Sequence, residues 1–180
     1  MTLFGTPVRR TEDHRLLTAG GTFVADLDLP GVAAVTYVVS PFAHARITSI
    51  DVEAARAMPG VIDVVVGTDV DLGPMPSVNP AFPETMTRAI LATEVVRFVG
   101  EPIVAIVAET AAEAIDAMAE VVVDYDPLPA VVGIEMSATD DVLLFPEAGT
   151  NTVMEAEGGS DAADVDIDGC EVVILSLIHI

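Results

Sequence analysis

The side chains best suited to chemistry are His44 and Arg46, two residues apart in the stretch SPFAHARITSID, residues 40–51. An imidazole transfers protons near neutral pH and a guanidinium holds anions, so this pair could serve general acid–base catalysis. The strand-like alternation from Ala43 places side chains on two faces: His44, Arg46 and Thr48 on one, Ala45, Ile47 and Ser49 on the other. No acidic or glycine-rich partner stands nearby in sequence. We therefore expect a polar strand edge facing solvent or a neighbouring domain, and we assign no catalytic residue.

A second candidate is the acidic stretch DVDIDG, residues 164–169, which matches the opening of an EF-hand calcium loop. Position 12 of such a loop needs a bidentate carboxylate, and here that residue is Leu175. Position 8, normally apolar, is Glu171. Calcium binding by this loop stays an open alternative, which titration of the protein and of an Asp166→Ala variant with Ca²⁺ would test.

Other cofactor motifs are missing from the sequence. One cysteine, Cys170, and three scattered histidines (14, 44 and 179) supply no ligand pair at zinc spacing. Neither a GxxxxGK[ST] loop nor a GxGxxG loop before a helix is present. We therefore assign no metal-binding and no cofactor-binding residue.

The charge of the chain excludes several partners. The 180 residues carry a formal net charge of −22, with seven arginines, no lysine and 29 acidic residues. All seven arginines lie in residues 1–100, and residues 101–180 hold 18 acidic residues and no basic one. Nucleic acid and anionic membranes both need a cationic surface, so neither is an expected partner. With no apolar leader, no span of about 18 apolar residues and one cysteine, we expect a cytoplasmic protein.

The elements that would position these side chains form two strand–helix–strand units of unequal length. The first has strands at 43–51 and 61–67 around a short helix at 52–58, which Asp51 caps and Pro59-Gly60 ends. The second has strands at 102–108 and 121–125 around a helix at 110–120, where Thr110 and Glu113 form a capping box. Its apolar face should hold Ala111, Ala114, Ile115, Met118 and Val122. A further strand is expected at 32–40.

Between the two units, residues 68–94 contain four prolines and should lack regular structure. A loop of this length is either functional, an interface, or a plain surface excursion, and the sequence leaves these alternatives open. Gly100, before Glu101 and Pro102, is the expected site of a positive φ angle in the turn that leads into the next strand.

Several segments, in this order, resemble the molybdenum-binding large subunits of aerobic carbon monoxide dehydrogenases, xanthine dehydrogenases and aldehyde oxidases. They are GTPVRRTEDHRLLTAGGTFVADLDLPG, SPFAHARITSID, AARAMPGVIDVVVG, VVRFVGEPIVAIVAE, AEVVVDYDPLPAVV and LFPEAGTN. The resemblance covers about Gly5 to Val132, with the last segment at 144–151. It implies an α/β hammerhead, a mixed α/β (α+β) fold with two strand–helix–strand arms.

The resemblance also implies a function. The family oxidises or hydroxylates small substrates with oxygen from water, using molybdenum held by a pterin dinucleotide, and passes electrons through [2Fe–2S] clusters to FAD on partner subunits. Its pterin contacts and catalytic glutamate lie beyond residue 180, so we expect this chain alone to be inactive and to hold no cofactor. The expected partners are the downstream molybdopterin domain, the FAD subunit and the iron–sulfur subunit. The alternative is a stand-alone acidic interaction module.

The predicted organisation has three parts: a lead-in at 1–24, the hammerhead at 25–135, and at 136–180 an acidic linker with the truncated start of a molybdopterin-binding domain. The family continues with a basic strand where this sequence reads ILSLIHI, residues 174–180. We expect a truncated reading frame or a foreign junction there. An open frame running on in register in the encoding DNA would support truncation.

Overall fold

The computed structural model describes most of the chain: residues 4–5, 7–21, 23–24, 27, 29–77, 79–155 and 169–173. Of the candidate calcium loop only Gly169 belongs to these residues, and the ILSLIHI end lies outside them. The calcium and truncation hypotheses therefore stay predictions.

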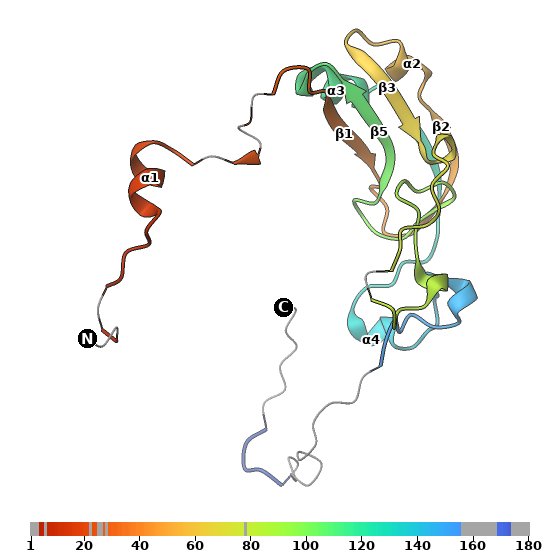
Figure 1. Ribbon diagram of the computed structural model, residues 1–180. Helices are drawn as coiled ribbons and strands as arrows, with labels where there is room; N and C mark the ends of the chain where they lie inside the picture. Colours follow the sequence, from red (N-terminus) through yellow and green to blue (C-terminus); the bar gives the residue numbers. More distant parts are fainter. Residues whose placement is uncertain are drawn as a thin grey trace.

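The folded body contains two three-stranded sheets (Figure 1). One has the strand order β1–β5–β3 and the other the order β4–β2–β6, and every pairing is antiparallel. The strands are β1 Ala34–Val39, β2 Ala45–Asp51, β3 Val61–Val66, β4 Val95–Val96, β5 Pro102–Ala108 and β6 Val122–Pro127. These bounds confirm the strands expected from the sequence to within three residues.

The helices are short. They are α1 Asp13–Thr18, α2 Glu53–Arg56, α3 Ala111–Met118 and α4 Ile134–Ser137, with 3₁₀ turns η2 Gly67–Asp69, η3 Glu84–Met86 and η4 Pro146–Ala148. Helix α1 was not expected from the sequence, and it lies apart from the sheets (Figure 1). Along residues 68–94 the chain is largely irregular, as the prolines indicated.

Each strand–helix–strand unit crosses from one sheet to the other. The first unit begins with β2 in the second sheet and ends with β3 in the first sheet. The second unit runs the opposite way, from β5 in the first sheet to β6 in the second. Both sheets are therefore built by pairing the first unit against the second, β2 with β6 and β3 with β5.

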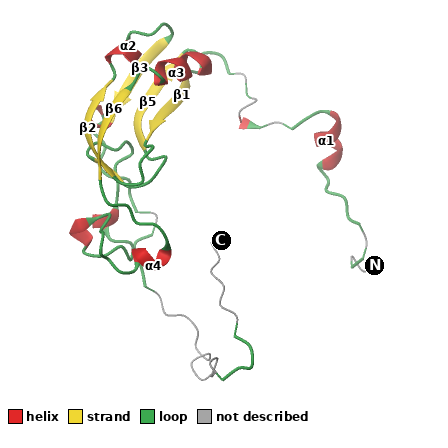
Figure 2. Ribbon diagram, turned by 180° about the vertical axis from the view of Figure 1, so that it is seen from behind, coloured by secondary structure: helices red, strands yellow, loops and turns green. Residues whose placement is uncertain are grey.

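The core lies on one side of the β1–β5–β3 sheet. Helix α3 contacts β1, β5 and β3, and α2 contacts β3 and α3. The second sheet adds its half-buried Ile47, Ile50, Val123 and Tyr125 to the same core. Figures 1 and 2, seen from opposite sides, show α3 on one side of β1 and β5.

Helix α3 starts where its cap was predicted. The Thr110 hydroxyl oxygen accepts a hydrogen bond from the Glu113 backbone N–H at 3.3 Å. The second half of the capping box differs, because the Glu113 carboxylate accepts a 2.8 Å bond from the Thr110 hydroxyl. The predicted apolar face is wrong at Ala111, Ile115 and Val122, which are exposed, because Ala114 and Ala117 are the helix residues that pack into the core.

The turn before β5 confirms another expectation. Gly100 has φ +93°, and its N–H donates to the Ser40 carbonyl while the Ser40 N–H donates to the Glu101 carbonyl. A side chain at Gly100 would meet no atom within 4 Å. The glycine is needed for its backbone conformation alone.

Candidate functional site

His44 is buried, contrary to the exposed strand edge expected from the sequence. It is 9% exposed, and its Nδ1 lies 2.7 Å from the Pro129 carbonyl oxygen, which requires Nδ1 to carry the proton and donate. The Leu128 N–H also donates to the His44 carbonyl. The imidazole thus fixes the chain just after β6 to the start of β2.

Arg46 remains exposed and lies in register with Asp126 of β6. Thr48 is exposed as expected, but the alternation fails at Ser49, which is exposed beside it because a β-bulge between Ile47 and Ser49 leaves Thr48 without a strand partner. The structure therefore separates the two candidates: His44 joins a backbone contact inside, and Arg46 stays on the water-facing side of β2.

Glu101 is the most buried charged residue among those described. It is 1% exposed, and its carboxylate accepts a hydrogen bond from the Arg97 backbone N–H. It lines a cavity of about 160 Å³ together with Arg88, Glu94 and Arg97. The buried carboxylate closes the loop between β4 and β5. Sequence reasoning missed this residue, although a charge directly before a continuous apolar strand is an unusual signal.

The Arg97 side chain reaches forward along the sequence to residues 144–145. Its Nε donates to the Leu144 carbonyl at 2.9 Å, and its guanidinium lies 4.5 Å from the centre of the Phe145 ring. A second donor binds the Val95 carbonyl at 3.3 Å. We call these contacts of Arg97 with Leu144 and Phe145 the Arg97 clamp. They connect the loop between β4 and β5, which Glu101 stabilises, to the segment that follows the hammerhead.

That following segment has its own polar network. The Asn151 side chain donates to the carbonyls of Ser137 and Val142 and accepts from the Leu144 N–H. The Asp140 carboxylate accepts from the Asn151 N–H and the Thr150 hydroxyl. Residues 136–152, at the start of the linker expected at 136–180, are therefore locally ordered by side-chain-to-backbone hydrogen bonds.

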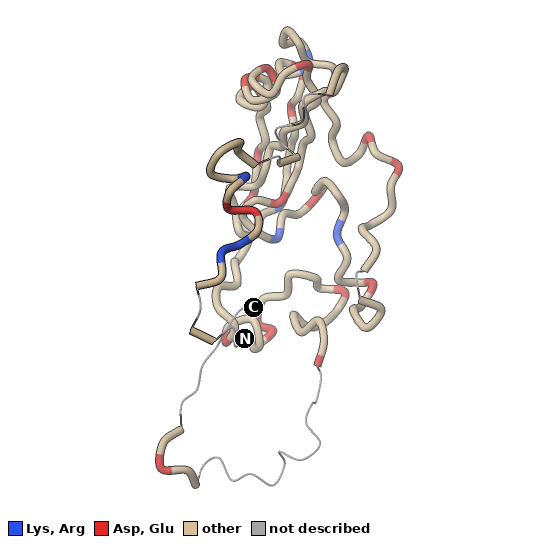
Figure 3. The backbone as a smooth tube through the Cα atoms, turned by 60° about the vertical axis from the view of Figure 1, so that its left-hand side comes forward, with Lys and Arg blue, Asp and Glu red and all other residues tan. Residues whose placement is uncertain are grey.

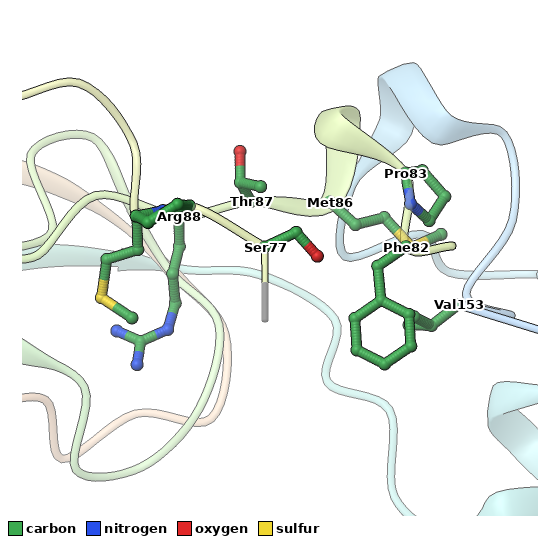
Figure 4. Close-up of a pocket in the computed structure, with 9 residues that line it drawn as sticks. Ser77, Phe82, Pro83, Met86, Thr87, Arg88 and Val153 are labelled. Atoms are coloured by element: carbon green, nitrogen blue, oxygen red, sulfur yellow. The ribbon is translucent and has the colours of Figure 1, made fainter. Parts of the chain in front are cut away.

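An apolar cavity of about 250 Å³ lies between the irregular loop and Val153. Figure 4 shows Phe82, Pro83, Met86 and Val153 at one end and Arg88 at the other. The Arg88 guanidinium lies 5.3 Å from the centre of the Phe98 ring. The long loop thus packs its own apolar residues against the chain that leaves the hammerhead.

Burial raises the pKa of the Tyr125 phenol, whose ring packs 4.9 Å from that of Phe42 in the core. Within the part of the chain that the structure describes, no group of three or more His, Cys, Asp or Glu could hold a metal ion. The polar side chains described above bind backbone groups, which is a positioning role.

Among the charged positions coloured in Figure 3, acidic residues are more frequent than arginines, in line with the net charge. No helix among the described residues is long and apolar enough to cross a bilayer. Two antiparallel sheets joined by two crossing strand–helix–strand units, with an ordered segment clamped below them, define an α/β hammerhead with the start of a following segment.

Comparison with known proteins identifies the family. Residues 18–129 match the family described as "Aldehyde oxidase and xanthine dehydrogenase, a/b hammerhead domain", so the chain belongs to it. The α/β hammerhead inferred from sequence is thereby confirmed, and so is the resemblance to the large subunits.

Several relatives are named as the large subunit or large chain of an enzyme. The chain is 35% identical to the nicotine 6-hydroxylase large subunit of Paenarthrobacter nicotinovorans, covering 98% of this chain and 22% of that protein. It is 38% identical to the carbon monoxide dehydrogenase large chain of Afipia carboxidovorans, covering 79% and 17%. The solved quinoline 2-oxidoreductase of Pseudomonas putida 86 matches with a TM-score of 0.64 and 46% identity, covering 74% and 17%. The chain thus spans about a fifth of these relatives' length.

Proposed function

We propose that this chain is the first part of the large subunit of a cytoplasmic molybdenum hydroxylase. In the parent enzyme a small substrate would be oxidised with oxygen from water. Molybdenum would be held by a pterin dinucleotide further along the subunit, and [2Fe–2S] clusters and FAD would lie on partner subunits. The family membership and the fivefold greater length of the relatives support this assignment.

The residues present do not fit the redox cofactors themselves. A [2Fe–2S] cluster needs four ligands, usually cysteines, and the sequence contains one cysteine. The buried Glu101 and His44 are engaged with backbone groups. We assign the hammerhead a structural role: it holds the segment that leads into the rest of the subunit and offers surfaces for docking.

The observation that carries this role is the Arg97 clamp on Leu144 and Phe145. The Arg97 guanidinium and the buried Glu101 carboxylate together hold residues 144–145 against the loop between β4 and β5. Holding this segment in place serves a polypeptide that continues into a further domain, and a stand-alone module would not need it. The three-part organisation, with the hammerhead at 25–135, stays part of this proposal.

The test is to express the full reading frame together with any adjacent frames for FAD and iron–sulfur subunits. The purified complex should contain molybdenum by elemental analysis and should reduce a dye with a substrate drawn from a panel of N-heteroaromatics, aldehydes and CO. Product formed in H₂¹⁸O should carry the label. A metal-loaded complex whose product takes its oxygen from O₂ would refute the proposed chemistry.

The alternative, a stand-alone acidic interaction module, predicts a different result. It requires a frame that ends near residue 180 with no oxidoreductase subunits beside it. The protein purified from its natural source would then have the mass of this chain, and molybdenum would be absent from it. A polypeptide of several times that mass excludes the module.

A further inference from the structure

The β1–β5–β3 sheet has a second face that no described element covers. Strand register places seven side chains on it, which we call the outer face: Val35, Tyr37, Val39, Asp63, Val65, Ala105 and Val107. On β1 these residues alternate with half-buried ones and are 52%, 48% and 46% exposed. The helices α2 and α3 pack on the opposite side of the sheet, as Figure 2 shows.

Apart from Asp63 on the edge strand β3, the outer face carries no charged side chain and is mainly apolar, which is unusual for a sheet surface in water. An antiparallel sheet with one solvated face normally alternates apolar residues inside with polar residues outside. The other sheet of this protein follows that rule. Its exposed positions on β2 and β6 include Arg46, Thr48, Asp124 and Asp126. The contrast lies between the two sheets of one chain.

We propose that the outer face is a docking surface for the downstream part of the same large subunit and is buried in the full-length protein. This inference rests on the proposed function, because it requires more polypeptide after this chain. Contiguous apolar patches on a monomer mark interaction sites, and this one, with a single carboxylate on its β3 edge, calls for a mainly apolar occupant.

Two observations favour the downstream polypeptide over a second copy. The first is charge: each copy carries a net charge of −22, so two copies brought together would repel. The second is length: the relatives have about four-fifths of their chain outside the matched region. A segment of the same polypeptide also binds at the high effective concentration that a covalent connection provides.

The first test measures burial in the full-length protein. Val35→Cys on the outer face is compared with Val122→Cys, since Val122 is a strand valine of similar exposure, 56%, at the edge of the other sheet. Maleimide labelling at each site is followed by mass spectrometry, native against denatured protein. We expect labelling at position 35 to be slowed at least about 100-fold in the native state. A slowing of less than about tenfold at position 35 overturns the proposal, whatever happens at position 122.

The second test identifies the occupant. A benzophenone amino acid replaces Tyr37 in the full-length protein, and the cross-linked peptides are sequenced after irradiation. Cross-links to residues beyond 180 with no mass shift of the chain on a denaturing gel support the proposal. Cross-links to a second copy, to another subunit or to the N-terminal lead-in overturn it. The outcome is separable from the proposed function, because a molybdenum-containing enzyme with cross-links elsewhere refutes only the docking surface.

Discussion

Replacing Glu101 by alanine should destabilise the fold by about 2–4 kcal/mol. The side chain is 1% exposed and accepts the Arg97 N–H, so its removal leaves a buried donor unsatisfied, at a cost of about 1–3 kcal/mol. The space vacated by the side chain adds a smaller packing term, about 1 kcal/mol. Glu101→Gln keeps an acceptor of the same shape and should lose only the charge assistance, about 1 kcal/mol.

The assay is urea unfolding of the 180-residue chain, followed by far-UV circular dichroism. With a slope of about 2 kcal/mol per molar urea, the alanine variant should unfold about 1–2 M earlier than the unchanged protein, and the glutamine variant about 0.5 M earlier. Glu120→Ala is the matched control, since it removes the same charge from an exposed position. If Glu101→Ala and Glu120→Ala share the unchanged midpoint, the buried carboxylate does not hold this loop and the reasoning fails.

Three further predictions use the same chain. Gly100→Val should cost about 1–3 kcal/mol, since φ +93° strains a β-branched residue, whereas Gly73→Val, also in open space but without positive φ, should be nearly neutral in the same unfolding assay. Thr110→Ala should cost about 1 kcal/mol through loss of the α3 cap, and Thr110→Ser should restore most of it; equal midpoints for all three proteins would place the helix start elsewhere. The Tyr125 pKa is raised by burial, so the folded state resists ionisation that the unfolded state permits above about pH 10, and stability should fall as pH rises past that point. The difference in absorbance near 295 nm between the unchanged protein and Tyr125→Phe, titrated from pH 8 to 12.5, isolates this group, and a midpoint at or below 10 would contradict the burial argument.

Local patterns predicted the elements well because their causes are local. The Thr110 cap and the strand β5 each depend on a few neighbouring residues, and the structure has both where the sequence predicted them. The positive φ of Gly100 follows from its place in the short turn between β4 and β5. Such features depend on backbone sterics and on hydrophobic periodicity, and both can be inferred from a short stretch of sequence.

The candidate site was predicted poorly because its contacts are distant in sequence. His44 is buried by a bond to Pro129, 85 residues away, which no alternation rule can foresee. A bulge at Thr48 also turned Ser49 to the exposed face, against the alternation expected for this strand. Arg97 likewise meets Leu144 across 47 residues. The resemblance to a family indicated the fold, but the roles of these side chains required the tertiary contacts.

The exchange of the two strand–helix–strand units between the sheets sets a condition on how the protein folds during synthesis. Strand β2 starts at Ala45 and has to wait for its long partner β6, which ends at Pro127. At about 5–20 residues per second, the ribosome needs roughly 4–16 s to make the intervening stretch. During that interval β2 lacks its long partner and the second sheet cannot close, while β1 and β3 wait for β5, which is complete at Ala108. Contacts of such high sequence separation make folding slow and leave unpaired edges open to misassociation, so the amino-terminal half depends on the arrival of the second unit to become protected.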